Sequence, residues 1–150
     1  MYTGLNHTHS LLRYVLLVIL IWTVVNAIKK WKGQEAFSPL DNKLSLFALI
    51  FAHLQLVIGL ILYAISPKVQ IALAEMPQAM GETALRYWAV EHITSMIVGI
   101  AFVTIGRVKA KKKELDKDKH KQVAVWMGIG LIIILVSIPW PFRGLGTGWF

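Results

Sequence analysis

Residues 86–107 read RYWAVEHITSMIVGIAFVTIGR, and this stretch decides the fold. The twenty residues from 87 to 106 would form about 30 Å of helix, which matches the ~30 Å hydrocarbon core of a bilayer. Glu91 and His92 lie inside this apolar stretch, where ionisable side chains are costly and usually functional. Small residues on the same helical face as His92 leave room beside it for a flat group or a close helix. These small residues are Ala89, Ser95 and Gly99.

The composition of the whole chain indicates an integral membrane protein. The 150 residues are 56% hydrophobic, with a mean hydropathy of +0.58, which is too apolar for a soluble domain of this length. The sequence contains no cysteine, which excludes disulfides, thiolate metal sites and iron–sulfur clusters. Any ligand to a metal must therefore come from histidine, methionine or a carboxylate.

The hydropathy pattern predicts a single domain, residues 1–150, with four membrane spans. The predicted spans are approximately 10–28, 44–65, 87–106 and 122–138. Asp41 is the expected N-cap of the second span. The segment 67–85 contains Pro77 and predicts one or two short helices on the membrane surface. Four spans with short connections predict an all-α, integral membrane four-helix bundle of up-down-up-down topology in contact with the lipid bilayer.

The distribution of lysines predicts the orientation of this bundle. Most of the lysines lie in the connections 28–43 and 108–121. By the positive-inside rule both connections face the cytoplasm, and both termini are extracytoplasmic. The net charge of +8 is thus a topology signal and a source of attraction to anionic lipid headgroups. Nucleic-acid binding is excluded because no soluble basic domain is present.

Three of the predicted spans each contain a histidine: His9, His53 and His92. Counting ~1.5 Å per residue from the cytoplasmic anchors places His53 at roughly 15 Å, His92 at roughly 22 Å and His9 at roughly 30 Å. Either His53–His92 or His9–His92 could therefore flank one iron. Two imidazoles from facing helices are the usual ligands of haem in a helical bundle. The haem propionates then need cations, and those at the outer end are Arg13, Arg86 and Arg143.

Other polar residues allow less specific interpretations. Glu91 could relay a proton, organise the surroundings of His92, or pair with Arg86 or Arg13. The His7-x-His9 pair is a weak copper or zinc motif, and His120, which lies among lysines, is expected to be solvated. Glycines in the third and fourth spans indicate close helix packing, and those of the fourth span are also a possible route to oligomers. These glycines are Gly99, Gly128 and Gly130.

Several segments resemble a family of short four-span membrane proteins of Bacteroidetes that are labelled cytochrome b or cytochrome-b-like. The resemblance covers nearly the whole chain, in the same order, through HTHSLLRY (7–14), AHLQLVIGLILY (52–63), VEHITSM (90–96) and IPWPFR (138–143). It implies haem b, electron transport and the inner (cytoplasmic) membrane of a bacterium. It also implies a polar centre of His9, His53 and His92, accompanied by Arg13 and Arg143. Three histidines leave one in excess for a six-coordinate haem.

The leading functional hypothesis is a small haem b protein that carries electrons, with a quinol and a respiratory or extracytoplasmic redox protein as partners. An electron carrier is favoured over a stand-alone enzyme, and Glu91 is the expected proton acceptor if a quinone reacts. Two alternatives remain: a site for one transition-metal ion (copper, iron or zinc) formed by His9, His53 and His92 without porphyrin, and an accessory subunit without a cofactor.

Between the two possible haem pairs, the sequence favours His53–His92. His92 is the only histidine whose depth lies within about 8 Å of both others. His53 is the most deeply placed of the three and the hardest to explain by solvation at the interface. In this arrangement His9 would lie above the haem edge, as a donor to a propionate or as a ligand to a second metal.

Overall fold

A computed structural model describes residues 2–145 of the chain. Every regular element in this range is helical, which confirms the all-α fold class. In chain order the elements are α1 (Tyr2–Gly33), α2 (Pro39–Ile65), α3 (Pro67–Ala74), α4 (Met76–Gly81), α5 (Thr83–Arg86), the π-helix η1 (Tyr87–Glu91), α6 (His92–Lys111), α7 (Asp116–Gln122), the π-helix η2 (Val123–Met127), α8 (Gly128–Ser137) and the 3₁₀-helix η3 (Pro141–Arg143).

Four helices are long and apolar enough to cross a membrane, as the sequence predicted, but they are longer than the expected spans. Their bounds are Tyr2–Gly33, Pro39–Ile65, Thr83–Lys111 and Asp116–Ser137. The lysines and arginines that marked the ends of the expected spans continue the helices, because both residue types are good helix formers. The charges thus mark the end of each apolar stretch, and the helix continues beyond that point.

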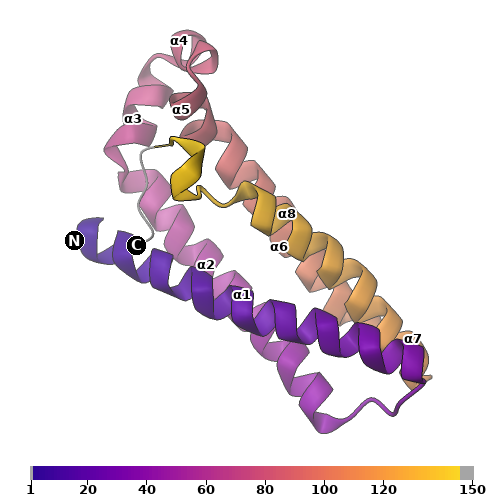
Figure 1. The fold of residues 1–150 in the computed structure, drawn as a ribbon. Coiled ribbons are helices and arrows are strands. Elements are labelled where there is room, and N and C mark those ends of the chain that lie inside the picture. The colour runs from indigo at the N-terminus through magenta and orange to yellow at the C-terminus, as the bar shows by residue number, and fades with distance from the viewer. Residues whose placement is uncertain (1, 146–150) are drawn as a thin grey trace.

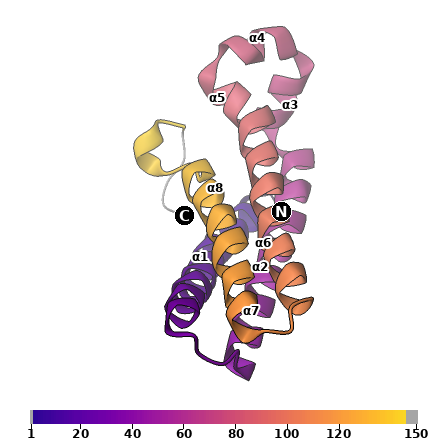
Figure 2. The ribbon, with the colours of Figure 1, turned by 90° about the vertical axis from the view of Figure 1, so that its right-hand side faces the viewer.

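The four long helices form a bundle with a ring of neighbouring contacts (Figures 1 and 2). In this ring α1 packs against α2, α2 against α6, and α6 against η2 and α8. The ring is completed by α1, which packs against α7 and η2 and much less against α8. The bundle is therefore closed at its lysine-rich end, and α1 and α8 diverge toward the opposite end.

Helices α6 and α8 pack closely at two glycines. A Cβ atom on Gly130 would lie 2.7 Å from the carbonyl oxygen of Gly99 and 3.2 Å from the backbone nitrogen of Val103. A Cβ atom on Gly128 would lie 3.7 Å from a methyl group of Val24, which is an ordinary contact. Gly99 and Gly130 thus mark close packing within the chain, whereas Gly128 does not.

At the lysine-rich end, a capping box joins α2 to α1. The N-cap of α2 is Ser38, and Asp41 is the third residue of the helix, so the expected N-cap was wrong by three residues. The reason is that Pro39 suits the first helical position and the Asp41 carboxylate bonds back to Ser38. Asp41 is 4% exposed and also accepts a 2.9 Å bond from Lys30 of α1.

His120 of α7 belongs to the same end of the molecule, and its expected solvation is also wrong. The residue is 0% exposed. Its ring lies 4.9 Å from that of Phe37, and its Nε2 atom is 3.4 Å from the carbonyl oxygen of Ala36. The two lysine-rich connections thus pack on each other through this histidine.

At the opposite end, the segment after α2 forms two short helices, α3 and α4, which agrees with the one or two expected, and α5 is the start of the third long helix. In both views α3, α4 and α5 extend beyond the ends of α1 and α8 (Figures 1 and 2). Ile71, Leu73 and Met80 expose apolar side chains on this segment, as an interfacial segment would. Lys68 and Val69, in the first turn of α3, line the cavity described below.

Candidate functional site: a cavity between two histidines

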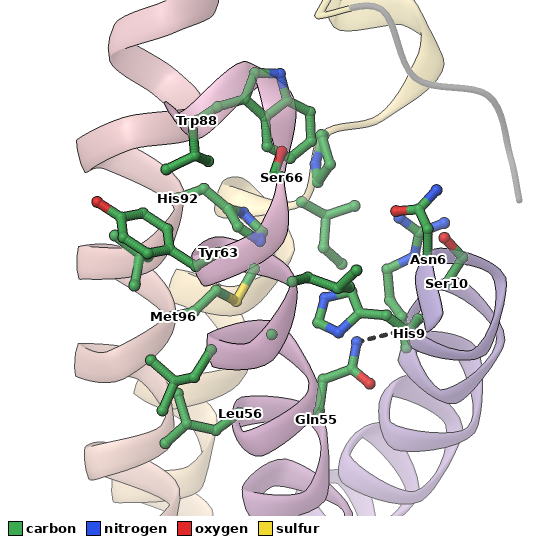
Figure 3. A pocket seen from close by; sticks show the side chains of 18 of the residues that line it. Asn6, His9, Ser10, Gln55, Leu56, Tyr63, Ser66, Trp88, His92 and Met96 are labelled. Atoms are coloured by element: carbon green, nitrogen blue, oxygen red, sulfur yellow. Dashed lines mark hydrogen bonds between the residues drawn. The ribbon is translucent and has the colours of Figure 1, made fainter. Parts of the chain in front are cut away.

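A cavity of about 380 Å³ lies at the end of the bundle opposite the lysines (Figure 3). Its volume is within the range of ~300–1,000 Å³ that is usual for ligand sites. Most of its wall is apolar, and a few polar groups project into it, which is also usual for such sites. The apolar wall includes Leu16, Leu56, Leu60, Ile93, Met96, Ile100, Ile134 and Ile138, and the polar lining includes Asn6, His9, Ser10, Arg13, Gln55, Ser66, Lys68 and His92.

His92, the first residue of α6, is held in one tautomer by the end of α8. Its Nδ1 atom lies 3.0 Å from the carbonyl oxygen of Ser137. A carbonyl oxygen accepts only, so Nδ1 carries the proton and donates it, which leaves Nε2 with a free lone pair. Donation from the other ring nitrogen to a backbone carbonyl is the arrangement typical of metal-ligating histidines.

The π-helix η1 adds Tyr87 to this arrangement. In an ordinary α-helix, Tyr87 and His92, five residues apart, would diverge by about 140°. The wider π-turn brings them together, with the Tyr87 hydroxyl 3.1 Å from His92 Nδ1 and donating a 2.6 Å bond to Ser137 O. Single π-turns in long helices are common at functional sites. The apolar sequence of this segment contains no signal for a π-turn, and for this reason the sequence does not predict that Tyr87 contacts His92.

His9 faces the same cavity from α1. Figure 3 shows the rings of His9 and His92 pointing toward each other from opposite sides of the cavity. The Gln55 amide of α2 donates a 2.8 Å bond to the backbone carbonyl of His9. A Cβ atom on Gly59 would lie 3.2 Å from Cε1 of His9, so this glycine makes space for the ring. The buried Nδ1 atom of His9 has no hydrogen-bond partner among the described residues.

His53 lies outside this cavity. Its side chain is exposed on the bundle surface, and its Nδ1 atom is 2.9 Å from the carbonyl oxygen of Leu49 in the preceding turn of α2. The structure therefore brings His9 and His92 to one site and does not bring His53 to it. Gln55, which is buried, takes the inward position that the sequence analysis gave to His53.

The charged residues that were predicted near the site lie in three different places. Arg13 lines the cavity, four residues from His9 on α1. Arg143 donates hydrogen bonds to the carbonyl oxygens of Val136 and Ile138. Its guanidinium lies 5.1 Å from the centre of the Tyr87 ring, and Tyr87 in turn contacts His92. Arg86 forms a 2.6 Å ion pair with Glu91. Of the three interpretations of Glu91, the structure supports the ion pair, and Glu91 does not line the cavity.

Among residues 2–145 no three or more histidine, aspartate or glutamate side chains gather closely enough to hold a metal ion by themselves. The cavity instead offers two histidines, from two helices, across one space. No protein-family model, curated protein or solved structure matches the chain. The fold and the site define a small four-helix protein of multi-pass membrane type with a two-histidine cavity near one end.

Proposed function

We propose that the chain is a small membrane haem b protein that carries electrons, and that His9 and His92 would hold the haem. The observation that supports this most strongly is that His9 of α1 and His92 of α6 face each other across one largely apolar cavity. Haem in electron-transfer proteins is commonly held by two protein side chains. The resemblance to the cytochrome-b-like family leads to the same proposal, although the histidine pair now proposed differs from the one favoured by the sequence alone.

The residues of the cavity suit such a group in three ways. His92 offers Nε2 because Ser137 fixes its tautomer, and the buried Nδ1 of His9 has no hydrogen-bond partner among residues 2–145. Arg13 supplies positive charge for the carboxylates of a porphyrin. The apolar side chains exclude water and so help to set the reduction potential. When bound, haem supplies one-electron chemistry, and the chain orients and shields it.

A site for a metal ion without porphyrin is less well supported. Protein zinc sites use at least three protein ligands, and the described residues offer no such group. An accessory subunit without cofactor would have little use for two histidines that line one largely apolar cavity. Haem accounts for both histidines and for the nearby arginine.

Visible spectroscopy of the purified full-length protein tests the proposal. The dithionite-reduced protein is expected to show the narrow α and β bands of low-spin haem b, with about one haem per chain. A reduced quinol should produce the same spectrum if quinol is the electron donor. Protein that stays colourless when expressed with added haem precursor and reconstituted with haem in detergent would contradict the haem proposal.

Within this proposal the protein lies in the inner membrane of a bacterium with both termini outside the cytoplasm. The support is the lysine content of the end formed by residues 28–43 and 108–121.

Reporter fusions test this orientation. A fluorescent reporter that matures only in the cytoplasm should be dark when fused after Phe150 and bright when inserted after Lys113 in the α6–α7 connection. The reverse pattern would invert the topology and place the histidine cavity on the cytoplasmic side.

A further inference from the structure

A second cavity, at the lysine-rich end, is lined by cations that the haem proposal does not use. Its volume is about 420 Å³, and it lies between the start of α2, the end of α6 and α7. The polar and charged residues that line it are Ser38, Asn42, Ser45, Arg107, Lys111 and Lys119. No acidic residue among residues 2–145 lines it, although Asp116 pairs with Lys119 at 2.8 Å.

Arg107 is the central residue of this cavity. It is only 7% exposed, and its Nη1 atom donates to the carbonyl oxygen and side chain of Asn42 and, at 2.6 Å, to the hydroxyl of Ser45. All three acceptors are neutral, and no carboxylate pairs with Arg107 in the part of the chain that the structure describes. A buried guanidinium without a counterion is costly. Its Nη2 and Nε atoms remain available for an anion.

We propose that this cavity binds the phosphate headgroup of an anionic phospholipid. Arginine recognises phosphate through two parallel hydrogen bonds, and Lys111 adds a second cation without an acidic partner among residues 2–145. Basic pockets between membrane helices on the cytoplasmic side are typical sites for such headgroups. This inference does not depend on the proposed haem.

The position of the cavity favours a lipid headgroup over a soluble anion as its ligand. Arg107 directly follows the apolar stretch 87–106, so the cavity is at the expected level of the headgroups. Leu40 and Phe47, which are seven residues apart and so lie on one face of α2, expose apolar side chains at this end of the helix. These side chains continue toward the middle of the span through Ile50 and Leu54, which are also exposed, and offer an apolar surface to acyl chains.

Binding of defined lipids to the full-length protein in a neutral detergent tests this inference. Native mass spectrometry can count bound phosphatidylglycerol during a titration, with phosphatidylcholine as the lipid without net charge. Phosphatidylglycerol should bind at least tenfold more tightly than phosphatidylcholine. The Lys111→Gln variant should bind it about fivefold more weakly, which is the usual effect of removing one cation beside an anionic lipid, and Arg107→Gln more weakly still.

Lys112→Gln is the matched control, because Lys112 is adjacent, exposed and outside the cavity. It removes the same charge and should change the affinity less than twofold. Lys111→Gln keeps the test valid even if Arg107→Gln does not fold. Equal weakening by Lys111→Gln and Lys112→Gln, or equal binding of the two lipids, would overturn the site. Displacement of phosphatidylglycerol by an equal concentration of inorganic phosphate would show a soluble-anion site and overturn the lipid assignment.

Discussion

His92→Ala and His9→Ala should each abolish the six-coordinate haem spectrum, whereas His53→Ala should retain it. The two histidines line one cavity from α1 and α6, and His53 is exposed elsewhere on α2. Loss of a hydrogen-bond partner of a ligand already costs 10–100-fold in metal affinity, so loss of a ligand should reduce haem retention by roughly 100-fold or more. The measurement is the reduced spectrum and haem content of each purified variant, normalised to protein.

The three variants serve as controls for one another, because each replaces a histidine by alanine on a long helix. His53→Ala should also keep the stability of the parent within about 0.5 kcal/mol, as surface substitutions usually do. A variant that loses haem but elutes as a folded monodisperse protein has lost a ligand. If His53→Ala lost the spectrum and His9→Ala kept it, the pair would be His53–His92, as first favoured from depth alone.

Gly130→Ala should be the most destabilising of the conservative glycine substitutions in the bundle. Its Cβ atom would lie 2.7 Å from Gly99 O and 3.2 Å from Val103 N, which are both backbone atoms of α6. Neither can move aside as a side chain would, so α6 and α8 must separate. We expect a cost of about 3 kcal/mol, at the upper end of the usual range for overpacking, and a melting temperature lower by roughly 10 °C.

Gly128→Ala is the control, since its Cβ atom would lie 3.7 Å from Val24 and requires no movement. Its melting temperature in detergent should equal or exceed that of the parent, because alanine has the higher helix propensity. Separation of α6 from α8 should also disturb the bond between His92 and Ser137, so Gly130→Ala should retain less haem. Equal melting temperatures for the two variants would contradict the close packing of α6 and α8.

The histidine pair shows how far depth along a helix predicts a site. Counting residues placed His9 and His92 within reach of each other, and both line the cavity. Counting residues along a helix does not show in which direction a side chain points. His53 and Gln55 are two residues apart and so project about 200° apart on a helix, which means that only one of them can face the interior. Gly59 lies four residues after Gln55, on the same face, and its lack of a side chain was the signal that this face meets another helix.

The number of spans, their order and the fold class follow from the sequence alone, because apolar length and lysine position are local properties that need no partner. The rotation of each helix about its own axis depends on the neighbours it packs against, so it becomes known from the tertiary structure alone. That rotation buries Gln55 in place of His53, and the π-turn at residues 87–91 brings Tyr87 to His92. The burial of His120 and the use of Gly130 rather than Gly128 at the α6–α8 contact have the same origin. Each of these depends on atoms from a second helix, which a pattern read along one helix does not contain.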